Sequence, residues 1–340
     1  MRYLVLPILV LFLLSGCATI TGPSVSQQEI LRAQEELMVK SLAFRLKQLE
    51  KVNDIGYRLI SDMPQEEIKV TKGPQPYLGM YASETDKYLK QLYRLNTDKG
   101  LVVIAVIAGS PVEQAGISAG DVLVSVDDKK VTSVRDFNQY SRRLNIGDLI
   151  KLQILRDGFR REIFLTVGSI PINVPIVMVD VQEVNAAAGS NAIYVTYGLM
   201  NFVKTDDEIA AVLAHELAHF VRGHVSKAQM SSLLSLLIGI PLGLVAEEAA
   251  PGTGELVMRT ADVFKAGYSR DLEREADYFG VKFVYFSGFN PCVCASFQER
   301  FAVEIPQSMI RNYLSTHPSS PERMLRIKKA VEEIARANCP

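Results

Sequence analysis

The amino-acid sequence predicts an α+β protein that combines a mainly helical region with a region rich in β-strands. Residues 27–61 contain no proline and place apolar side chains at helical spacing, and residues 205–224 and 268–283 show the same periodicity. Residues 100–168 instead consist of short apolar runs separated by Gly, Ser-Pro and Asp-Gly turns, which is typical of strands. A chain of 340 residues with 48% hydrophobic side chains is long enough to form two separate cores.

The charge balance argues against one class of partner. The chain carries 37 Lys and Arg against 38 Asp and Glu, for a net charge of −1, and no long basic run interrupts this balance. We therefore expect no nucleic-acid partner.

The first residues have the composition of an export signal. Arg2 is followed by an apolar run from Leu4 to Leu14 and by small residues before Cys17. This pattern predicts a secretory signal peptide over residues 1–16. The run is shorter than the roughly 20 residues that span a bilayer, which disfavours an uncleaved anchor helix.

The stretch Leu14-Ser15-Gly16-Cys17 resembles the bacterial lipobox. The resemblance implies an exported lipoprotein of a bacterium with two membranes, in which Cys17 carries lipid and forms the mature N-terminus. Ala18 in the following position favours the outer membrane over the inner one. We therefore expect a protein on the periplasmic side of the cell envelope that is lipid-anchored in the outer membrane.

A long amphipathic helix is expected after the signal, with one break. We expect residues 17–40 to form a spacer from the membrane and the helix to pack against a core from about Leu42 onward. A Pro/Gly-rich joint at residues 63–79 then marks a boundary. The apolar positions of the helix are Ile30, Leu37, Leu42, Leu46, Leu49 and Val52.

The β-rich region carries its turn signals in order. A buried apolar run ends at Gly109, and Ser110-Pro111 supplies an N-cap and a first helical residue. Residues 122–126 alternate as a strand does, and residues 134–144 present one apolar helical face. Asp157-Gly158 between two alternating runs predicts a β-hairpin.

The segment GSPVEQAGISAGDVLVSVDDKKV, residues 109–131, resembles a bacterial PDZ domain. The resemblance implies a β-rich PDZ domain over residues 72–170 that binds extended peptide tails as an added strand at a sheet edge. The alternative is a domain that serves only as a spacer or as an interdomain clamp. By resemblance, the loop whose backbone N–H groups receive the ligand carboxylate comprises Tyr77, Leu78, Gly79 and Met80.

Three of the four histidines lie in one short stretch, AHELAHFVRGH, residues 214–224. Thr205 or Asp206 can cap the helix that carries this stretch. On the helix, His215 and His219 are four residues apart and share one face, which suits the binding of Zn²⁺ by two imidazoles.

Glu216 and His224 differ from this pair. Glu216 can reach a water molecule held in an open coordination position and can act there as a general base. His224 lies about 140° round the helix from His219. We therefore expect His224 to be a cation near the helix C-terminus and not a metal ligand.

A catalytic zinc site has three protein ligands, so the motif lacks one. The segment YSRDLEREADYFGVKF, residues 268–283, predicts a second helix on which Glu273 and Asp277 share a face. Glu273 is the expected third ligand. Asp277 is expected to accept a hydrogen bond from a ligand histidine.

The His-Glu-x-x-His motif together with LEREAD resembles the gluzincin zinc peptidases of the BepA, LoiP and HtpX type. Eukaryotic relatives of that family include the CAAX prenyl protease and the mitochondrial Oma-type protease. The resemblance implies a mainly helical zincin-type metallopeptidase domain with a small β-sheet, built from residues 41–70 and 171–340. It further implies that the PDZ domain is inserted between these two parts.

The same resemblance implies the roles of the site residues. One Zn²⁺ per chain would be bound by His215, His219 and Glu273. Glu216 would act as general base and then as general acid, and Asp277 would orient a ligand histidine.

The same resemblance also implies roles for residues outside the ligand set. His317 and Arg323 match a family His-Pro motif and its spacing, which implies a role in stabilising the transition state or in gating; a structural role is the alternative. The segment NAAAGSNAIYV departs from the family pattern, which has an aromatic residue after Asn-Ala and a Pro-Gly pair. Within it we expect an edge strand that binds substrate, formed by Ala192, Ile193, Tyr194 and Val195.

The cysteines and one apolar stretch complete the predictions. If Cys17 carries lipid, an oxidising periplasm permits one disulfide, from Cys339 to either Cys292 or Cys294. Residues 233–246 are apolar but too few to span a bilayer. We expect them to form part of a core or a lid rather than to contact the membrane.

Together these resemblances predict a membrane-anchored periplasmic zinc endopeptidase that hydrolyses unfolded or misassembled envelope proteins. The expected partners are protein and peptide substrates, the membrane through Cys17, and the outer-membrane assembly machinery. Two alternatives stay open, namely a latent peptidase that acts mainly as a chaperone or adaptor and a PDZ binding module with a structural zinc ion. Glu216 argues against both, because a structural zinc ion needs no general base.

Overall fold

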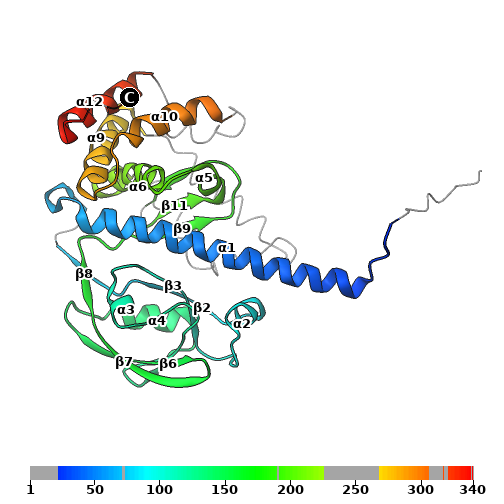
Figure 1. The fold of residues 1–340 in the computed structure, drawn as a ribbon. Helices are drawn as coiled ribbons and strands as arrows, with labels where there is room; N and C mark the ends of the chain where they lie inside the picture. Colours follow the sequence, from blue (N-terminus) through cyan, green and yellow to red (C-terminus); the bar gives the residue numbers. More distant parts are fainter. Residues whose placement is uncertain are drawn as a thin grey trace, which may run out of the picture.

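The computed structural model describes residues 22–70, 73–189, 191–225, 268–305, 317, 321–337 and 339. The predicted signal peptide, Cys17 and the apolar stretch at residues 233–246, predicted to belong to a core or a lid, lie outside the described residues. The described elements form an α+β fold, as predicted, in which a helical domain and a β-rich domain lie on opposite sides of one long helix (Figure 1). Among the described helices, none is long and apolar enough to cross a membrane.

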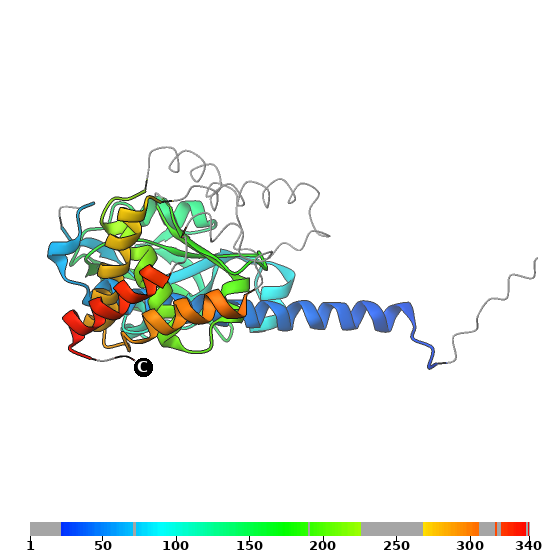
Figure 2. The same ribbon diagram turned by 90° about the horizontal axis from the view of Figure 1, so that it is seen from above.

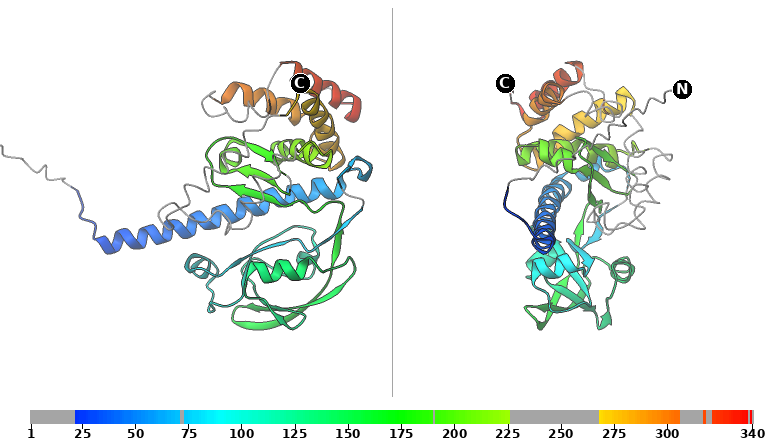
Figure 3. Two further views of the ribbon diagram at one scale, coloured as in Figure 1. Left: turned by 180° about the vertical axis from the view of Figure 1, so that it is seen from behind. Right: turned by 90° about the vertical axis from the view of Figure 1, so that its right-hand side faces the viewer.

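The long helix α1 (Gln27–Asp62) is continuous over 36 residues, so the predicted break is wrong. Ser26 caps the helix, because its hydroxyl accepts the N–H of Glu29 while its own N–H donates to the Glu29 carboxylate at 2.8 Å. Side chains up to Leu37 are exposed, and burial begins at Leu42. The N-terminal half of α1 therefore projects from the body of the molecule, whereas the C-terminal half lies within it (Figures 2 and 3).

The β-rich domain is built on an antiparallel six-stranded sheet. Its strand order is β2 (Met80–Glu84), β3 (Leu101–Val106), β4 (Val122–Val126), β6 (Leu149–Arg156) and β7 (Phe159–Thr166), with β5 (Lys129–Lys130) paired to β4. The helices of this domain are α2 (Lys87–Tyr93), α3 (Pro111–Gln114) and α4 (Val134–Ser141). Within the described ranges β2 pairs only with β3, so β2 is an edge strand.

Local turn chemistry fixes this domain as predicted. The Ser110 hydroxyl accepts the N–H of Glu113, and Pro111 begins α3. Asp157 and Gly158 have φ angles of 53° and 81°, which allow the tight turn between β6 and β7. The core beneath the sheet includes the fully buried side chains of Leu101, Val126 and Leu152.

Two short strands join the β-rich domain to the rest of the chain. β1 (Gln75–Tyr77) pairs antiparallel with β8 (Gly168–Ile170). The chain therefore enters and leaves this domain at neighbouring points.

The helical domain contains a small three-stranded sheet. Its strand order is β10 (Ala186–Ala188), β11 (Ile193–Thr196) and β9 (Ile176–Val179), with β11 antiparallel to β10 and parallel to β9. The helical elements are η1 (Gln65–Glu67), α5 (Tyr197–Phe202), α6 (Asp206–Val221), α9 (Arg270–Phe286), α10 (Val293–Glu304) and α12 (Pro321–Ala335).

The predicted substrate edge strand is wrong in its place in the sheet. Ile193, Tyr194 and Val195 belong to β11, which Ala192 precedes, and β11 is hydrogen-bonded on both sides. Its backbone cannot receive an added strand, because β9 and β10 already occupy both edges. Of the described strands, β10 is the edge strand that packs against α6.

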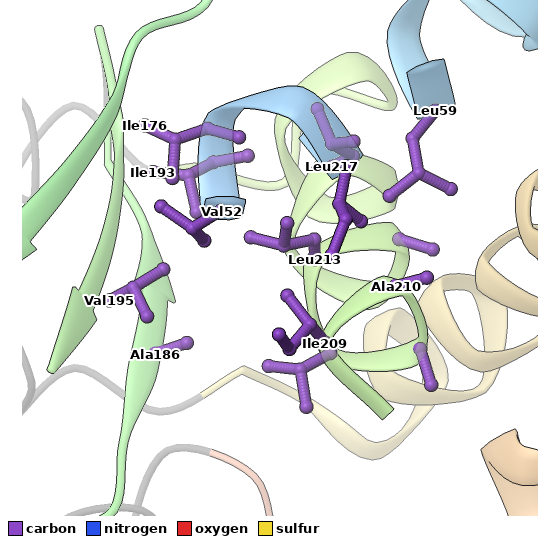
Figure 4. Close-up of a cluster of buried hydrophobic side chains, with 14 of the residues drawn as sticks. Val52, Leu59, Ile176, Ala186, Ile193, Val195, Ile209, Ala210, Leu213 and Leu217 are labelled. Atoms are coloured by element: carbon purple, nitrogen blue, oxygen red, sulfur yellow. The ribbon is translucent and has the colours of Figure 1, made fainter. Parts of the chain in front are cut away.

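The main core surrounds the C-terminal half of α1. Figure 4 shows Val52 and Leu59 of α1 among buried side chains of β9, β11 and α6. Val102 and Ile104 of β3 belong to the same core. Helix α1 thus packs against both domains, which explains the length of its buried stretch.

A disulfide links the start of α10 to the segment that follows α12. Cys292, which precedes α10, is bonded to Cys339, which follows α12. Cys294 keeps a free thiol and is buried. Of the two pairings that the sequence permits, the structure forms the one with Cys292.

Candidate metal centre

Helix α6 carries the His-Glu-x-x-His motif through the interior of the helical domain. Thr205 is its N-cap, and the Thr205 hydroxyl accepts the N–H of Glu208. Every residue from Glu208 to His219 is buried, because α1, α9, α10 and β10 pack around the helix. The imidazoles of His215 and His219 are therefore held in fixed positions.

Helix α9 lies directly against α6. Ser269 caps α9 by accepting the N–H of Leu272. At Gly280, an added Cβ would lie 3.3 Å from both Cα and the backbone N of His215, so glycine permits this close approach of the two helices. Glu273 and Asp277 lie about two turns and one turn before Gly280 on the same face, and both therefore reach the motif.

The result is one buried group of four side chains that could hold a metal ion. A ligand atom from each lies within 4.8 Å of the others. His219 Nε2 lies 3.2 Å from His215 Nε2 and 3.2 Å from Glu273 Oε1. Donors around a tetrahedral zinc ion with bonds of 2.0–2.1 Å lie about 3.3 Å apart, so these donors fit zinc. The four residues are His215, His219, Glu273 and His317.

The charges around this group favour a cation. Burial and Arg323 act to lower the pKa of His215, but Asp277 and Glu273 outweigh them and raise it to about 9. Burial acts to raise the pKa of Glu273, but the imidazoles around it, first among them His317, hold it well below its ordinary range. A charged carboxylate is thus retained in a dry site, where a bound cation would balance it.

Asp277 lies beside His215, as expected from its place on α9. His215 Nδ1 is 3.1 Å from Asp277 Oδ1, which leaves the other ring nitrogen turned toward the donor group. Arg323 of α12 donates to both oxygens of Asp277, at 2.7 and 2.8 Å. Burial acts to raise the pKa of Asp277, but Arg323 and His215 outweigh it and hold that pKa below its usual value.

Glu216 is fully buried with its two oxygens in different surroundings. Oε2 accepts the N–H of Ala188 at 2.7 Å. Oε1 accepts no hydrogen bond from the described residues and lies 3.4 Å from His317 Nε2. Burial raises the pKa of Glu216 above its ordinary value, against the opposing effect of His317. One oxygen is thus anchored, and the other faces the donor group.

His317 stands in the donor group itself, although the sequence suggested only a neighbouring role. Its side chain is completely buried, with Nδ1 2.9 Å from Glu273 Oε1 and 3.3 Å from His215 Nε2. Arg323 lies nearby, with Nη1 3.0 Å from Glu273 Oε2. No sequence pattern gives these distances, because His317 is brought in from a part of the chain 98 residues beyond His219.

His224 lies just beyond the C-terminal end of α6 and is not one of the four residues of the donor group, as predicted. The chain leaves α6 after Val221 and turns at Gly223, whose φ is 76°. His224 folds back so that its Nδ1 lies 3.0 Å from Nδ1 of His219, on the side away from the donor group. Burial lowers the pKa of His224 despite the carboxylate of Glu275, which favours a neutral ring.

Strand β10 borders the donor group, and sequence reasoning missed it. The Ala188 carbonyl accepts the hydroxyl of Tyr268 at 3.3 Å, while the Ala188 N–H bonds Glu216. The Tyr268 ring stacks on His219 with 3.7 Å between ring centroids. Three successive alanines carry no strand signal, and Tyr268 belongs to no motif, so only the fold reveals both.

The predicted peptide-binding loop lies where the chain enters edge strand β2. Tyr77 is in β1, and Met80 begins β2. The carbonyls of Leu78 and Gly79 accept backbone N–H groups from α3 and from the residue after β3, at 3.1 and 2.9 Å. Gly79 has a φ of 88°, which favours glycine at this turn.

Comparison with protein-family models assigns both domains. Residues 167–331 match the model of peptidase family M48. The chain carries an M48 peptidase domain. Residues 76–167 match the PDZ domain model. The sequence-based resemblances to an Oma-like metallopeptidase and to a PDZ domain are therefore confirmed.

Parts of the chain are similar to individual known proteins. The chain is 30% identical over 150 residues to the mitochondrial metalloendopeptidase OMA1 of Arabidopsis thaliana, which covers 44% of this chain and 30% of that protein. It is 28% identical over 112 residues to a probable periplasmic serine endoprotease DegP-like of Ectopseudomonas mendocina (strain ymp), covering 33% and 23%. A solved structure, HtrA-type protease AlgW with decapeptide, is 24% identical with a TM-score of 0.28, covering 29% and 31%. The chain thus spans less than a third of each of these proteins.

Proposed function

We propose that the chain is a zinc-dependent endopeptidase. The observation that carries this proposal is a buried group of three imidazoles and one carboxylate at zinc-ligand spacing, with Oε1 of Glu216 3.4 Å from the imidazole of His317. His215, His219 and Glu273 would hold one Zn²⁺. When bound, the ion supplies Lewis-acid chemistry at a peptide carbonyl and at a water molecule.

In this reaction Glu216 moves the proton. Its Oε1 takes a proton from the attacking water, and the same carboxyl then protonates the amine of the broken peptide bond. A raised pKa suits this exchange, because the carboxyl must both accept and release a proton near neutral pH. Asp277 would keep His215 in the orientation that suits a metal ligand, and Arg323 holds Asp277 in place.

We propose β10 as the strand along which substrate lies. The N–H and carbonyl of Ala188 reach Glu216 and Tyr268, so they point away from β11. An extended peptide added here would donate a backbone N–H to the Ala188 carbonyl once the Tyr268 hydroxyl releases it, while the Ala188 N–H stays bonded to Glu216. Unfolded chains offer such extended backbone, which supports unfolded or misassembled proteins as substrates.

We propose that the protein acts on the periplasmic side of the cell envelope, anchored in the outer membrane by lipid on Cys17. The signal pattern of residues 1–16 and the lipobox resemblance support this location. The substrates would then be envelope proteins in need of quality control. The outer-membrane assembly machinery is the proposed partner.

We also propose that the PDZ domain, residues 72–170, is inserted into a peptidase domain made of residues 41–70 and 171–340, and that it binds substrate or partner tails. The packing of α1 on α6 and β9 supports the first part. The antiparallel pairing of β1 with β8 supports an insertion, because it brings the two ends of the PDZ domain together.

A latent peptidase that acts mainly as a chaperone is the second candidate, and His317 favours it. A catalytic zinc ion keeps one coordination position for water, whereas four protein ligands are typical of a closed site. His317 Nδ1 lies close enough to Glu273 and His215 to be a fourth ligand. Displacement of His317 would then be required before water could bind.

One experiment separates these proposals. The soluble chain from Ala18 onward is purified, its zinc is measured, and cleavage of unfolded casein is followed before and after chelation and zinc replacement. We expect cleavage to stop on chelation and to return with zinc. Glu216→Gln should keep its zinc but cleave about 10²- to 10⁴-fold more slowly, whereas Glu304→Gln, an exposed glutamate outside the site, should match wild type.

Equal cleavage by Glu216→Gln and wild type would contradict the mechanism. A wild-type protein that binds zinc without cleaving casein, together with a His317→Ala variant that cleaves, would establish the latent form. Zinc binding with no cleavage in either protein would favour the chaperone function.

A further inference from the structure

A cleft of about 890 Å³ separates the two domains and is lined by both of them. Such a volume is within the range of natural ligand sites. Residues of β2 and α4 line it on the PDZ side, whereas α1, residues 173–176 and residues 191–192 line it on the peptidase side. The cleft lies apart from the metal-binding side chains, which do not line it.

The PDZ side of this cleft has the features of a site for a peptide C-terminus. Edge strand β2 can receive an added strand alongside α4. The N–H of Val134 at the start of α4 donates to Glu84 at the end of β2, so the C-terminal end of α4 lies toward the start of β2. Met80 and Phe137 offer an apolar pocket there, and Arg142 supplies a positive charge for a terminal carboxylate.

The peptidase side is tied firmly to the same strand. The Tyr81 hydroxyl on β2 donates to Asn53 Oδ1 on α1 at 2.6 Å. Tyr57 of α1 stacks on Tyr77, with 5.1 Å between ring centroids. The N–H of Asn173 donates to the Gln75 side chain at 3.0 Å, and Asn173 Nδ2 approaches the carbonyl of residue 76 at 3.5 Å. These contacts fix a second wall across the cleft from α4.

We infer that the peptide site of the PDZ domain is completed by the peptidase domain. This inference rests on the proposed tail-binding role of the PDZ domain and adds the second wall to it. The occupant is an extended C-terminal tail of another protein, with an apolar last residue and uncharged residues before it. The reason is that Arg142 is the one charged side chain among the described residues lining the cleft.

The second wall also places the tail near the peptidase strand. Asn191 and Ala192 line the cleft, and the turn they belong to is closed by the N–H of Gly189, which donates to the Ala192 carbonyl at 2.8 Å. Ala188, the residue before this turn, donates to Glu216. A tail in the cleft is therefore held at the end of β10 that leads to the proposed base.

The test measures peptide binding to the soluble full chain carrying Glu216→Gln, which prevents cleavage. The probe is a fluorescein-labelled ten-residue peptide of Ser and Thr ending in Val with a free carboxylate, followed by fluorescence anisotropy. Asn173→Asp puts a negative charge beside the loop that would receive the carboxylate. We expect it to weaken binding roughly tenfold. Asn96→Asp, an exposed change outside the cleft, should leave binding unchanged.

A second measurement needs no change at the wall. Peptides in which two upstream Ser residues are replaced by Glu should bind at least about tenfold more weakly to the same protein, because Arg142, the one charged side chain among the described residues lining the cleft, already pairs with the terminal carboxylate. Two results together would overturn the composite site while leaving PDZ tail binding intact. The first is equal binding of the Val-terminated peptide with and without Asn173→Asp. The second is equal binding of the peptides with and without the upstream Glu residues. No binding of the first peptide, with casein cleavage by wild type retained, would overturn tail binding and the composite site together.

Discussion

Arg323 connects three elements through a single side chain. It is buried on α12, and its guanidinium reaches Asp277 and Glu273 on α9 as well as the ring of His215 on α6. A guanidinium suits this position because its planar fork can satisfy two carboxylates at once. Arg323 therefore offsets part of the negative charge of Glu273 and Asp277 without belonging to the donor group.

We predict that Arg323→Met lowers the free energy of unfolding by about 3–5 kcal/mol, because it leaves buried carboxylates without their cation. The control is Arg326→Met on the same helix, where an exposed ion pair with Glu322 is lost. Arg326→Met should lower the free energy of unfolding by less than about 1 kcal/mol. Urea unfolding of both variants, followed by circular dichroism, measures the difference. Equal losses would show that the buried contacts of Arg323 do not stabilise the fold.

The side chains that could be predicted from the sequence are those that helical spacing brings together. His215 and His219 are four residues apart, as are Glu273 and Asp277, so each pair is visible as a pattern. His317 has no such neighbour, and its place in the donor group depends on how the chain returns after α10. Contacts between residues that are far apart in the sequence produce no periodic pattern.

Strand order shows the same limit among the elements. Helices α6 and α9 could be predicted because their apolar periodicity and caps are strong. Periodicity indicates that β11 is a strand but does not identify its neighbours. The sequence therefore predicts an edge strand at residues 192–195, whereas the structure places β11 between β10 and β9. Helix α1 lacks the expected break because no proline interrupts its 36 residues.

The turn between β4 and β5 contains a carboxylate whose contribution depends on pH. Asp127 has a φ of 45° and accepts the N–H of Lys151 at 2.9 Å. It also accepts the Tyr140 hydroxyl at 2.5 Å. The backbone hydrogen bond from Lys151, followed by that of Tyr140, lowers the pKa of Asp127. A lowered pKa means that folding favours the charged carboxylate.

We predict that Asp127→Asn is less stable than wild type at pH 7 and that the difference shrinks on acidification. The stabilisation by the charged group is fully present above the unfolded pKa of about 3.9, and it is lost as the pH falls through the lower folded pKa. Scanning calorimetry of both proteins at pH 7 and at pH 3 measures this. A difference in melting temperature that stays constant or grows at pH 3 would contradict the assignment.

The two domains are joined through α1, and Asn53 marks the junction. Its Nδ2 donates to the carbonyls of Leu49 and Ile176, at 2.9 and 3.1 Å, and its Oδ1 accepts the Tyr81 hydroxyl. One buried amide thus links α1, the peptidase sheet and the PDZ edge strand. The apolar spacing of α1 indicates that it packs, but not that it packs on both domains, because an Asn in a helix gives no sign of its distant partners.

We predict that Asn53→Leu lowers the free energy of unfolding by about 1–3 kcal/mol, because the partners at Ile176 and Tyr81 are left buried without a hydrogen bond. Tyr81→Phe should lower the free energy of unfolding by less than Asn53→Leu does. The double variant should cost less than the sum of the two single changes, since both remove the same bond. Chemical unfolding of the three variants gives these values, and strict additivity would mean that the two side chains do not interact.

The proposed catalytic centre depends on one metal position. Anomalous diffraction at the zinc absorption edge, recorded from crystals of the soluble chain purified with its metal, locates that position directly. We predict a single strong peak about 2.0–2.2 Å from Nε2 of His215, Nε2 of His219 and a carboxylate oxygen of Glu273. A zinc peak elsewhere in the molecule, or no peak in protein that cleaves casein, would contradict the proposed centre.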